Sequence, residues 1–206
     1  MSANPRIAFF DGIADRWDGW VDLGALGPRL AAGLVALGVG RDEAVLDVGC
    51  GTGNLSAALL GHLSPRGRVV AVDISARMIE VARGKVRDAR VAWHAADARA
   101  LPLGDASCDR AICYSVWPHF DDPAAVAREL ARVLVPGGRL HVWHTDPRER
   151  INGIHAGAGE AVRGDVLPPA DATAALLARA GYVVSAAAED GEGYLVTARK
   201  PGGQGA

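Results

Sequence analysis

A run of glycines is the strongest chemical signal in this sequence. It reads DVGCGTG over residues 47–53 and follows a short apolar stretch at 44–48, so it marks a turn from a buried strand into a helix. Glycine lets a backbone turn tightly and approach a ligand without obstruction from a Cβ atom. In doubly wound sheets ligands bind at such turns. Asn54 stands where the dinucleotide fingerprint needs glycine, which disfavours a nicotinamide cofactor.

Two acids follow the next two apolar runs. Asp73 ends the run at 68–72, and a carboxylate in that place can accept hydrogen bonds from both hydroxyls of a ribose. Asp97 lies just beyond the run at 90–94, where it can accept a hydrogen bond from an adenine amino group. A single Asp after a strand is also a common turn former or helix cap, and for Asp97 this structural alternative stays open.

Three histidines, His119, His144 and His155, follow the predicted strands at 109–114 and 139–143. The carboxyl ends of parallel strands are where a doubly wound sheet carries its active site. Three interpretations remain open. The histidines are ordinary surface or capping residues, or one or two accept protons or bind substrate, or all three form a divalent metal centre.

Apolar runs and helical periodicities alternate along the chain, which predicts a parallel sheet covered by helices on both faces. Helices are expected at 7–20, 26–37, 54–63, 76–86 and 123–134, and a further turn at 136–138 precedes the strand at 139–143. The last two strand-like runs, 182–187 and 194–199, are joined by too short a link for a parallel return. The sheet is therefore expected to end with an antiparallel strand.

Composition limits the classes of partner. The chain has 206 residues, which fits one α/β domain, and its formal net charge of -2 comes without any run of Lys and Arg. No apolar stretch reaches the roughly 18 residues of a membrane span, and residues 1–7 lack a signal-peptide core. Three sparse cysteines suit reduced thiols. We therefore expect a cytoplasmic protein that acts on a small molecule and binds neither nucleic acid nor membrane.

Taken together and in order, these motifs resemble the class I S-adenosylmethionine-dependent methyltransferases. The resemblance runs from about Val45 to Trp143 and includes the glycine turn, Asp73, Asp97 and a Pro-Gly-Gly turn at 136–138. The antiparallel final hairpin is also typical of that family. The acid-or-Asn, Pro, Pro, aromatic motif of enzymes that methylate nucleobase amino groups is missing after the fourth strand, so a DNA substrate is not expected.

The resemblance implies S-adenosylmethionine as the cofactor and assigns residues to it. Asp47 would organise the glycine turn, and Asp73 and Asp97 would hold ribose and adenine. The remaining implied contacts, to the methionine part and around the adenine ring, are Gly49, Gly51, Gly53, Ile74, Met78 and Ala98. For the two larger apolar residues of this set a plain core role is an equal alternative.

We thus expect a single domain over 1–206 with a three-layer α/β/α fold and a seven-stranded, mostly parallel sheet. Residues 1–20 are expected to form a helical lid, 146–167 a cap on the substrate side, and 201–206 a disordered tail. The protein is expected to be a monomer or homodimer.

The expected activity is methyl transfer from S-adenosylmethionine to an O, N or S nucleophile of a small molecule. His119 or His144 is the first candidate for removing a proton, with His155 or a divalent metal as further assistance. A non-catalytic S-adenosylmethionine-binding regulator and a nicotinamide-dependent oxidoreductase are the alternatives.

Overall fold

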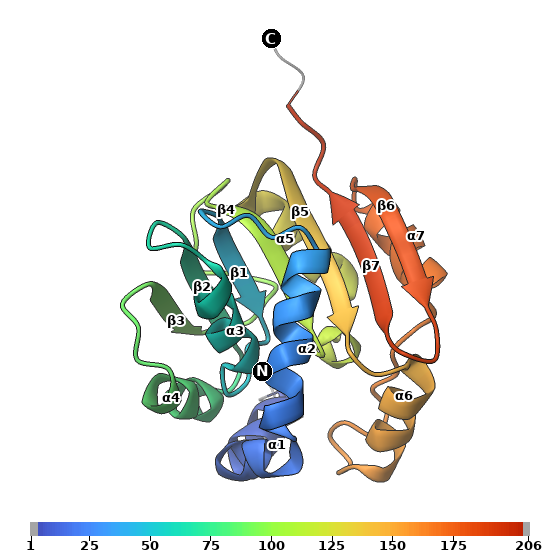
Figure 1. Ribbon diagram of the computed structural model, residues 1–206. Helices are drawn as coiled ribbons and strands as arrows, with labels where there is room; N and C mark the ends of the chain where they lie inside the picture. Colours follow the sequence, from blue (N-terminus) through green and yellow to red (C-terminus); the bar gives the residue numbers. More distant parts are fainter. Residues whose placement is uncertain (1–3, 204–206) are drawn as a thin grey trace.

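The computed structural model describes residues 4–203 and contains one seven-stranded sheet between two layers of helices (Figure 1). The strands are β1 (Ala44–Val48), β2 (Arg68–Asp73), β3 (Val91–Ala95), β4 (Cys108–Tyr114), β5 (Leu134–His144), β6 (Val183–Glu189) and β7 (Tyr194–Arg199). The α-helices are α1 (Pro5–Ile13), α2 (Leu23–Ala36), α3 (Asn54–His62), α4 (Ala76–Lys85), α5 (Pro123–Val133), α6 (Arg148–Gly157) and α7 (Ala170–Arg179), with 3-10 helices η1 (Ala14–Trp20) and η2 (Trp117–His119).

The strand order is β3-β2-β1-β4-β5-β7-β6. The first five strands run parallel, and β7 pairs antiparallel with both β5 and β6. The predicted three-layer, doubly wound fold with an antiparallel last strand is therefore confirmed. Strand order reverses between β1 and β4, so the gap beyond their carboxyl ends is where this topology places a ligand.

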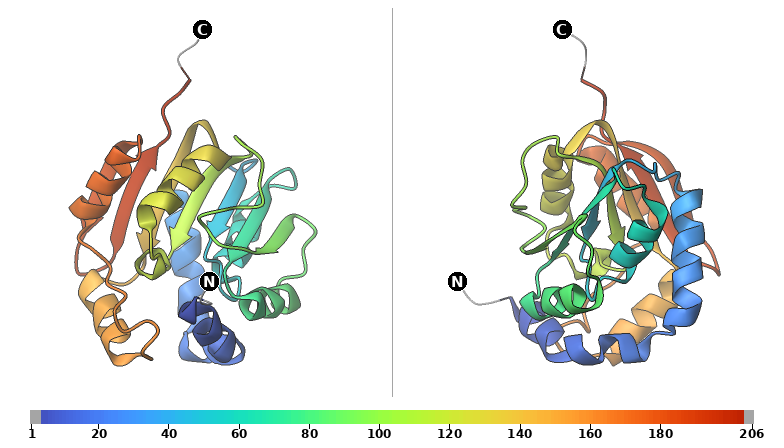
Figure 2. Two further views of the ribbon diagram at one scale, coloured as in Figure 1. Left: turned by 180° about the vertical axis from the view of Figure 1, so that it is seen from behind. Right: turned by 60° about the vertical axis from the view of Figure 1, so that its left-hand side comes forward.

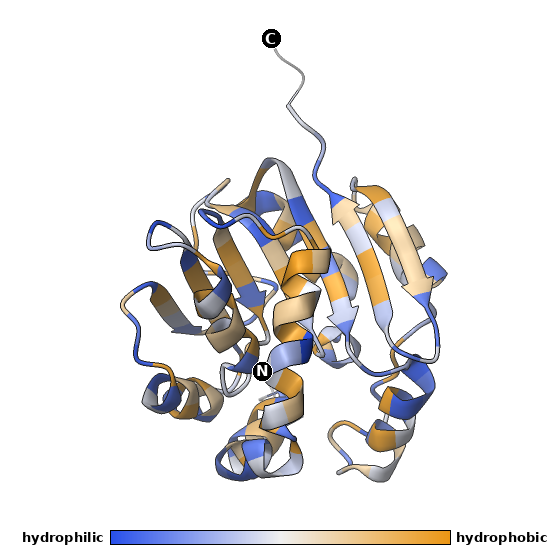
Figure 3. Ribbon diagram, in the orientation of Figure 1, coloured by the Kyte–Doolittle hydropathy of each residue, from blue (hydrophilic) through white to orange (hydrophobic). Residues whose placement is uncertain are grey.

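Apolar side chains on both faces of the central strands explain why the sheet is covered twice. All five residues of β1 are buried. Helices α2 and α3 pack on one face, where Leu34 and Leu59 belong to one hydrophobic cluster. Helices α5 and α7 pack on the other face, where Leu130 and Leu177 belong to a separate cluster (Figure 2). The hydropathy colouring shows the same hydrophobic central strands (Figure 3).

Two predicted boundaries were wrong. The expected single helix at 7–20 is α1 followed by the 3-10 helix η1. Strand β5 begins at Leu134, not at 139, so the Pro-Gly-Gly segment lies inside the strand. The reason is tertiary: the main chain of Lys200, just after β7, bonds with both Gly137 and Gly138, while Gly137 adopts a φ of 83°. These bonds continue the ladder through a segment whose local sequence favours a turn.

Helices α1 and α6 lie beyond the carboxyl ends of β1, β4 and β5, apart from the main helical layers (Figure 1). Neither helix has a buried residue. Within residues 4–203 no helix combines the length and apolar character needed to span a membrane. Of the expected tail, residues 201–203 have no regular secondary structure, and the last three residues lie outside the described range.

Candidate active site

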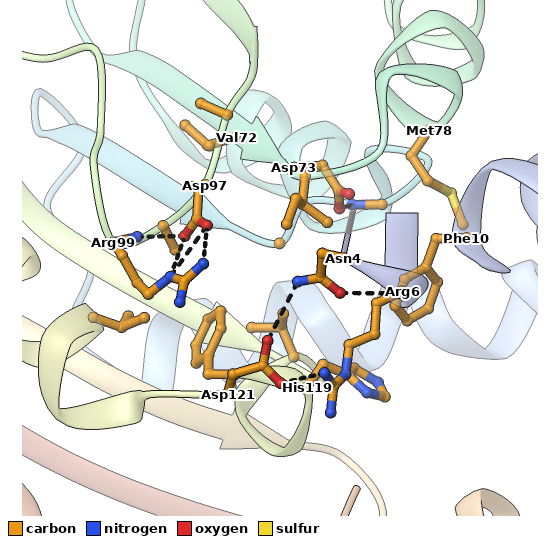
Figure 4. Close-up of a pocket in the computed structure, with 18 of the residues that line it drawn as sticks. Asn4, Arg6, Phe10, Val72, Asp73, Met78, Asp97, Arg99, His119 and Asp121 are labelled. Carbon is orange, nitrogen blue, oxygen red and sulfur yellow. Dashed lines mark hydrogen bonds and ion pairs between the residues drawn. The ribbon is translucent and has the colours of Figure 1, made fainter. Parts of the chain in front are cut away.

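A cavity opens at the carboxyl edge of the sheet, under α1 and η1 (Figure 4). Its walls come from the glycine turn, the ends of β2, β3 and β4, and the N-terminal segment. The residues that line it are Asn4, Arg6, Phe10, Trp17, Gly49, Gly51, Val72, Asp73, Ile74, Met78, Ala96, Asp97, Ala98, Arg99, Ser115, Val116, His119, Phe120, Asp121 and Val126. Most of the residues predicted to bind the cofactor are thus brought together in one cavity.

The three glycines of the turn have different surroundings. Gly49, Gly51 and Gly53 all have positive φ, at 69°, 52° and 82°, a conformation that favours glycine. A Cβ on Gly49 would lie 2.2 Å from Val116 Cγ2, whereas one on Gly51 would meet no protein atom within 4 Å. Gly53 does not line the cavity, and its Cβ would instead meet Trp93 at 3.0 Å. Gly51 therefore borders open space, and Gly53 serves packing.

Asp47 lies beneath the glycine turn and not in the cavity. It is 1% exposed and accepts a hydrogen bond of 2.6 Å from Ser56 Oγ in the first turn of α3. Burial raises the pKa of Asp47 to about 7, although the hydrogen bonds from Ser56 oppose this. Asp47 is thus placed to tie β1 to α3 across the turn, without direct access to a ligand.

We expect Asp47→Asn to flatten the pH dependence of stability. The pKa of Asp47 rises on folding from an ordinary value near 4, so the folded state binds more protons, and stability falls as pH rises towards and through 7. From pH 5 to pH 8 the wild type should lose about 2.6 kcal/mol that the variant does not lose. Urea unfolding of both proteins at the two pH values measures this double difference. Equal losses would show that Asp47 is ionised throughout.

Asp73 ends β2 with both carboxylate oxygens turned to the glycine turn and α4. One oxygen accepts from Gly51 N at 2.8 Å, and the other accepts from Ser75 N at 2.9 Å. Burial raises the pKa of Asp73, and the two main-chain hydrogen bonds oppose the rise. The carboxylate lines the cavity beside Ile74 and Met78, and each of its oxygens retains a further lone pair.

Asp97 lies across the cavity from Asp73 and is bonded to Arg99 (Figure 4). Both of its oxygens accept from that guanidinium, with Nη2 to Oδ2 at 2.6 Å, and hydrogen bonding to Arg99 holds the pKa of Asp97 below its usual value. Ala98 and Met78 add apolar wall. The cavity therefore combines apolar lining with a carboxylate, which suits a flat ring with an amino group.

The N-terminal segment covers the cavity and is held there by polar contacts. Phe10 and Trp17 line the cavity, with ring centroids 6.3 Å apart. Asp11 accepts from Ser75 Oγ at 2.5 Å, at the start of α4. Asp18 accepts from Thr52 Oγ1 at 2.6 Å, beside the glycine turn. The roof of the cavity is therefore joined to the turn and helix that form its floor.

His119 is the one predicted histidine that lines the cavity. Its Nδ1 donates to Asp165 Oδ2 at 2.6 Å, and its ring lies 5.1 Å from that of Phe10. The Asp165 side chain is 2% exposed, but hydrogen bonds from His119 and Arg6 more than offset burial and lower the pKa of Asp165. An ionised carboxylate on Nδ1 leaves the lone pair of His119 on Nε2.

His155 lies against His119, with ring centroids 4.7 Å apart, but outside the cavity lining. Its Nδ1 donates to the main-chain oxygen of Asp165 at 2.8 Å. Burial and the nearby His119 lower the pKa of His155, so its ring is neutral near pH 7. One residue, Asp165, therefore anchors both imidazoles, through its side chain and its main chain.

His144 is 2% exposed, and its Nε2 has no hydrogen-bond partner. Burial, together with His119 and His155, lowers the pKa of His144 to about 3. Of the three histidines at this edge of the sheet, only His119 lines the cavity. Across residues 4–203 no group of three His, Cys, Asp or Glu side chains is arranged to hold a metal ion. The arrangement instead fits proton transfer at His119.

The sequence analysis missed Arg6 and Asp165. Arg6 bonds both Asp121 and Asp165, and so joins α1 to the loops after β4 and α6. No motif marks these residues, because Arg6 and Asp165 are 159 positions apart and meet only in the folded chain. The nearest signal was the predicted cap at 146–167, which contains Asp165 but gave it no role.

Comparison with known proteins agrees with this geometry. A family model described as a methyltransferase domain matches residues 46–142. The methyltransferase GfsG of Streptomyces halstedii is 36% identical over 148 residues, covering 66% of this chain and 52% of that protein. The ubiquinone/menaquinone biosynthesis C-methyltransferase UbiE of Desulfotalea psychrophila is 33% identical, covering 71% and 61%. The chain thus spans about half the length of the curated relatives it matches.

The fold has close counterparts among solved structures. A SAM-dependent methyltransferase from Aquifex aeolicus superposes with a TM-score of 0.70 at 24% identity, covering 82% of this chain and 88% of that one. That likeness concerns the fold, and the family-model match covers the glycine turn and strands β2 to β4 that build the cavity. Residues 46–142 thus match a methyltransferase domain, within a chain that has the fold of a SAM-dependent methyltransferase.

Proposed function

We propose that this protein transfers a methyl group from S-adenosylmethionine to an O, N or S nucleophile of a small molecule, with His119 accepting the proton that the nucleophile loses. The observation that carries the proposal is the joining, in one cavity, of Gly51 and Asp73 with a histidine whose Nδ1 is held by a buried carboxylate.

The residues present fit the cofactor. Gly51 borders space that a Cβ would enter without meeting protein, Asp73 offers oxygens to a ribose, and Met78 with Ala98 forms an apolar wall for an adenine ring. Asp97 stands at the rim of that wall for the exocyclic amino group. Asp47 and Gly53 support the turn from behind.

When bound, S-adenosylmethionine supplies a methyl group already activated by a positively charged sulfur. The protein therefore has to align the acceptor, exclude water and take up a proton. His119 Nε2 is free to accept that proton, and the Asp165 carboxylate on Nδ1 would fix the ring and stabilise its protonated form, as a buried carboxylate does for other catalytic histidines. Phe10 and Trp17 would keep water away from the reacting atoms.

Two measurements test the proposal. Calorimetry should show binding of S-adenosylmethionine or S-adenosylhomocysteine and no binding of NAD. Tighter binding of NAD would contradict the proposed methyl transfer and favour an oxidoreductase. A panel of small phenols, amines and thiols, incubated with S-adenosylmethionine and followed by mass spectrometry, should give at least one product heavier by a methyl group. Tight cofactor binding with no product across the panel would favour the non-catalytic regulator.

We expect Asp73→Ala to weaken S-adenosylmethionine binding about ten- to hundredfold. The substitution removes a carboxylate that would accept from the ribose hydroxyls, and charged hydrogen bonds of this kind contribute roughly 1.5–3 kcal/mol. It also removes the acceptor of Gly51 N, so circular dichroism must first confirm the fold. Calorimetry measures the affinity, and Asp105→Ala, an exposed acid outside the cavity, is the matched control. Wild-type affinity in folded Asp73→Ala would place the ribose elsewhere.

A further inference from the structure

Arg6 extends from the first turn of α1 to the carboxylate that holds His119. Its Nε donates to Asp165 Oδ2 at 3.1 Å and its Nη2 donates to Oδ1, so the guanidinium contacts both oxygens. The Nδ1 of His119 donates to the same Oδ2 at 2.6 Å. One buried carboxylate therefore joins a residue of the N-terminal segment to the histidine that lines the cavity.

The start of α1 fixes Arg6 in this place. Asn4 caps the helix, because its side chain accepts a hydrogen bond from Arg6 N at 3.0 Å, and its Nδ2 donates to Asp121 Oδ2 at 3.3 Å. Arg6 Nη1 donates to the other oxygen of Asp121 (Figure 4). Since α1 has no buried residue, these polar contacts hold its first turn over the cavity.

Asp165 lies between α6 and α7 in a segment without regular secondary structure, and its own contacts hold it there. Its main-chain N–H donates to the oxygen of Val162 at 3.0 Å, and its main-chain oxygen accepts from His155 Nδ1 at 2.8 Å. Its side chain is bonded to His119 and Arg6. Loss of the Arg6 guanidinium would leave Oδ1 of a buried carboxylate without this bond, so the carboxylate would hold His119 less firmly.

Arg6 also affects the balance of charge at His119. An ionised carboxylate beside an imidazole favours the protonated ring, whereas a guanidinium on the same carboxylate opposes protonation. Hydrogen bonding to Asp165 raises the pKa of Arg6, so the guanidinium stays charged. Arg6 therefore favours a His119 ring with a free lone pair on Nε2. The other titratable groups around the ring are Asp73 at the end of β2, Asp121 after η2, His144 at the end of β5 and His155 on α6.

We propose that Arg6 is a positioning residue for His119, which it orients and keeps unprotonated through the carboxylate of Asp165. The N-terminal segment then supplies part of the catalytic centre as well as the roof of the cavity. The inference rests on the proposed function, since it takes His119 as the group that accepts the proton.

Three variants separate the charge of Arg6 from the attachment of the N-terminal segment. Arg6→Gln removes the charge, and Arg6→Lys keeps a charge without the planar fork of donors. Arg77→Gln is the matched control, because Arg77 joins the N-terminal segment to α4 through Asp15 instead of Asp165. After circular dichroism has confirmed the fold, NMR titration of the ligand-free proteins gives the midpoint of His119. The pH profile of product formation gives the acid limb of the reaction.

Arg6→Gln should raise the titration midpoint of His119 by about one pH unit, because loss of a positive charge makes protonation easier while the other groups around the ring are unchanged. The acid limb of product formation should move to higher pH by a similar amount. Arg6→Lys should reverse most of the shift, and Arg77→Gln should leave the midpoint and the limb as in the wild type.

An unchanged midpoint in folded Arg6→Gln would overturn the inference. An equal shift in Arg77→Gln would also overturn it, because the attachment of the N-terminal segment, and not the charge of Arg6, would then be the cause. The titration needs neither S-adenosylmethionine nor a methyl acceptor, so its result does not depend on the proposed function. Full turnover in His119→Ala would separately refute the base in that function.

Discussion

Replacing His119 by alanine is expected to slow methyl transfer about 10²- to 10⁴-fold, because the acceptor then has no positioned group to take its proton. His119 lines the cavity with Nδ1 committed to Asp165 and Nε2 free. The cofactor contacts we propose, at Asp73 and Gly51, lie on other elements, so the affinity for S-adenosylmethionine should change less than about threefold. Product formation with the acceptor found in the panel, together with calorimetry, measures the two quantities separately.

Matched variants distinguish chemistry at His119 from a change in packing. Asp165→Asn keeps the shape but removes the charge, so it should slow the reaction and alter its pH profile, with a smaller loss than His119→Ala. Arg6→Gln removes the other partner of Asp165 and leaves the carboxylate on His119. Turnover in Arg6→Gln should therefore exceed that in Asp165→Asn. Full turnover in His119→Ala would remove it from the mechanism, and the acceptor would then be one that needs no base.

The parts of the fold that were predicted are those with a local physical cause. The buried strand at 44–48 and its glycine turn were recognised because apolar runs and positive-φ glycines leave a mark in a few residues. The final hairpin was recognised because the link between 187 and 194 is too short for a parallel crossover. The early start of β5 was missed because it depends on bonds to Lys200, more than 60 positions away.

The residues of the candidate site also divide into those that the sequence predicts and those that depend on tertiary contacts. The cofactor residues come from consecutive strand ends, and parallel topology alone brings Asp73 and Asp97 to one edge. The histidines could be assigned to that edge, but not to the cavity. An edge position does not tell whether a ring lines the cavity, as at His119, or is buried away from it, as at His144. Asp165, which orients His119, lies in a loop with no periodicity to predict it.

Gly49→Ala is expected to destabilise the ligand-free protein by about 2–5 kcal/mol, and Gly51→Ala by only about 1–2 kcal/mol. Both glycines have positive φ, so both variants carry the cost of a left-handed backbone. At Gly49 the added methyl would also lie 2.2 Å from Val116 Cγ2, whereas at Gly51 it meets no protein atom within 4 Å. Urea unfolding of the two single variants and the wild type measures both losses.

The clash and the cofactor can then be told apart within the same pair. Val116→Gly in the Gly49→Ala background should remove the clash and leave only the cost of the left-handed backbone. The double variant should therefore lose as much free energy of unfolding as Gly51→Ala and Val116→Gly lose together when measured singly. Gly51→Ala, whose new methyl enters the cavity itself, should lose S-adenosylmethionine binding at least tenfold while its fold changes least. If Gly51→Ala binds S-adenosylmethionine as tightly as the wild type, the space beside Gly51 is not where the cofactor lies. If Gly51→Ala and Gly49→Ala lose equal stability, the Val116 side chain moves away from the methyl added at Gly49.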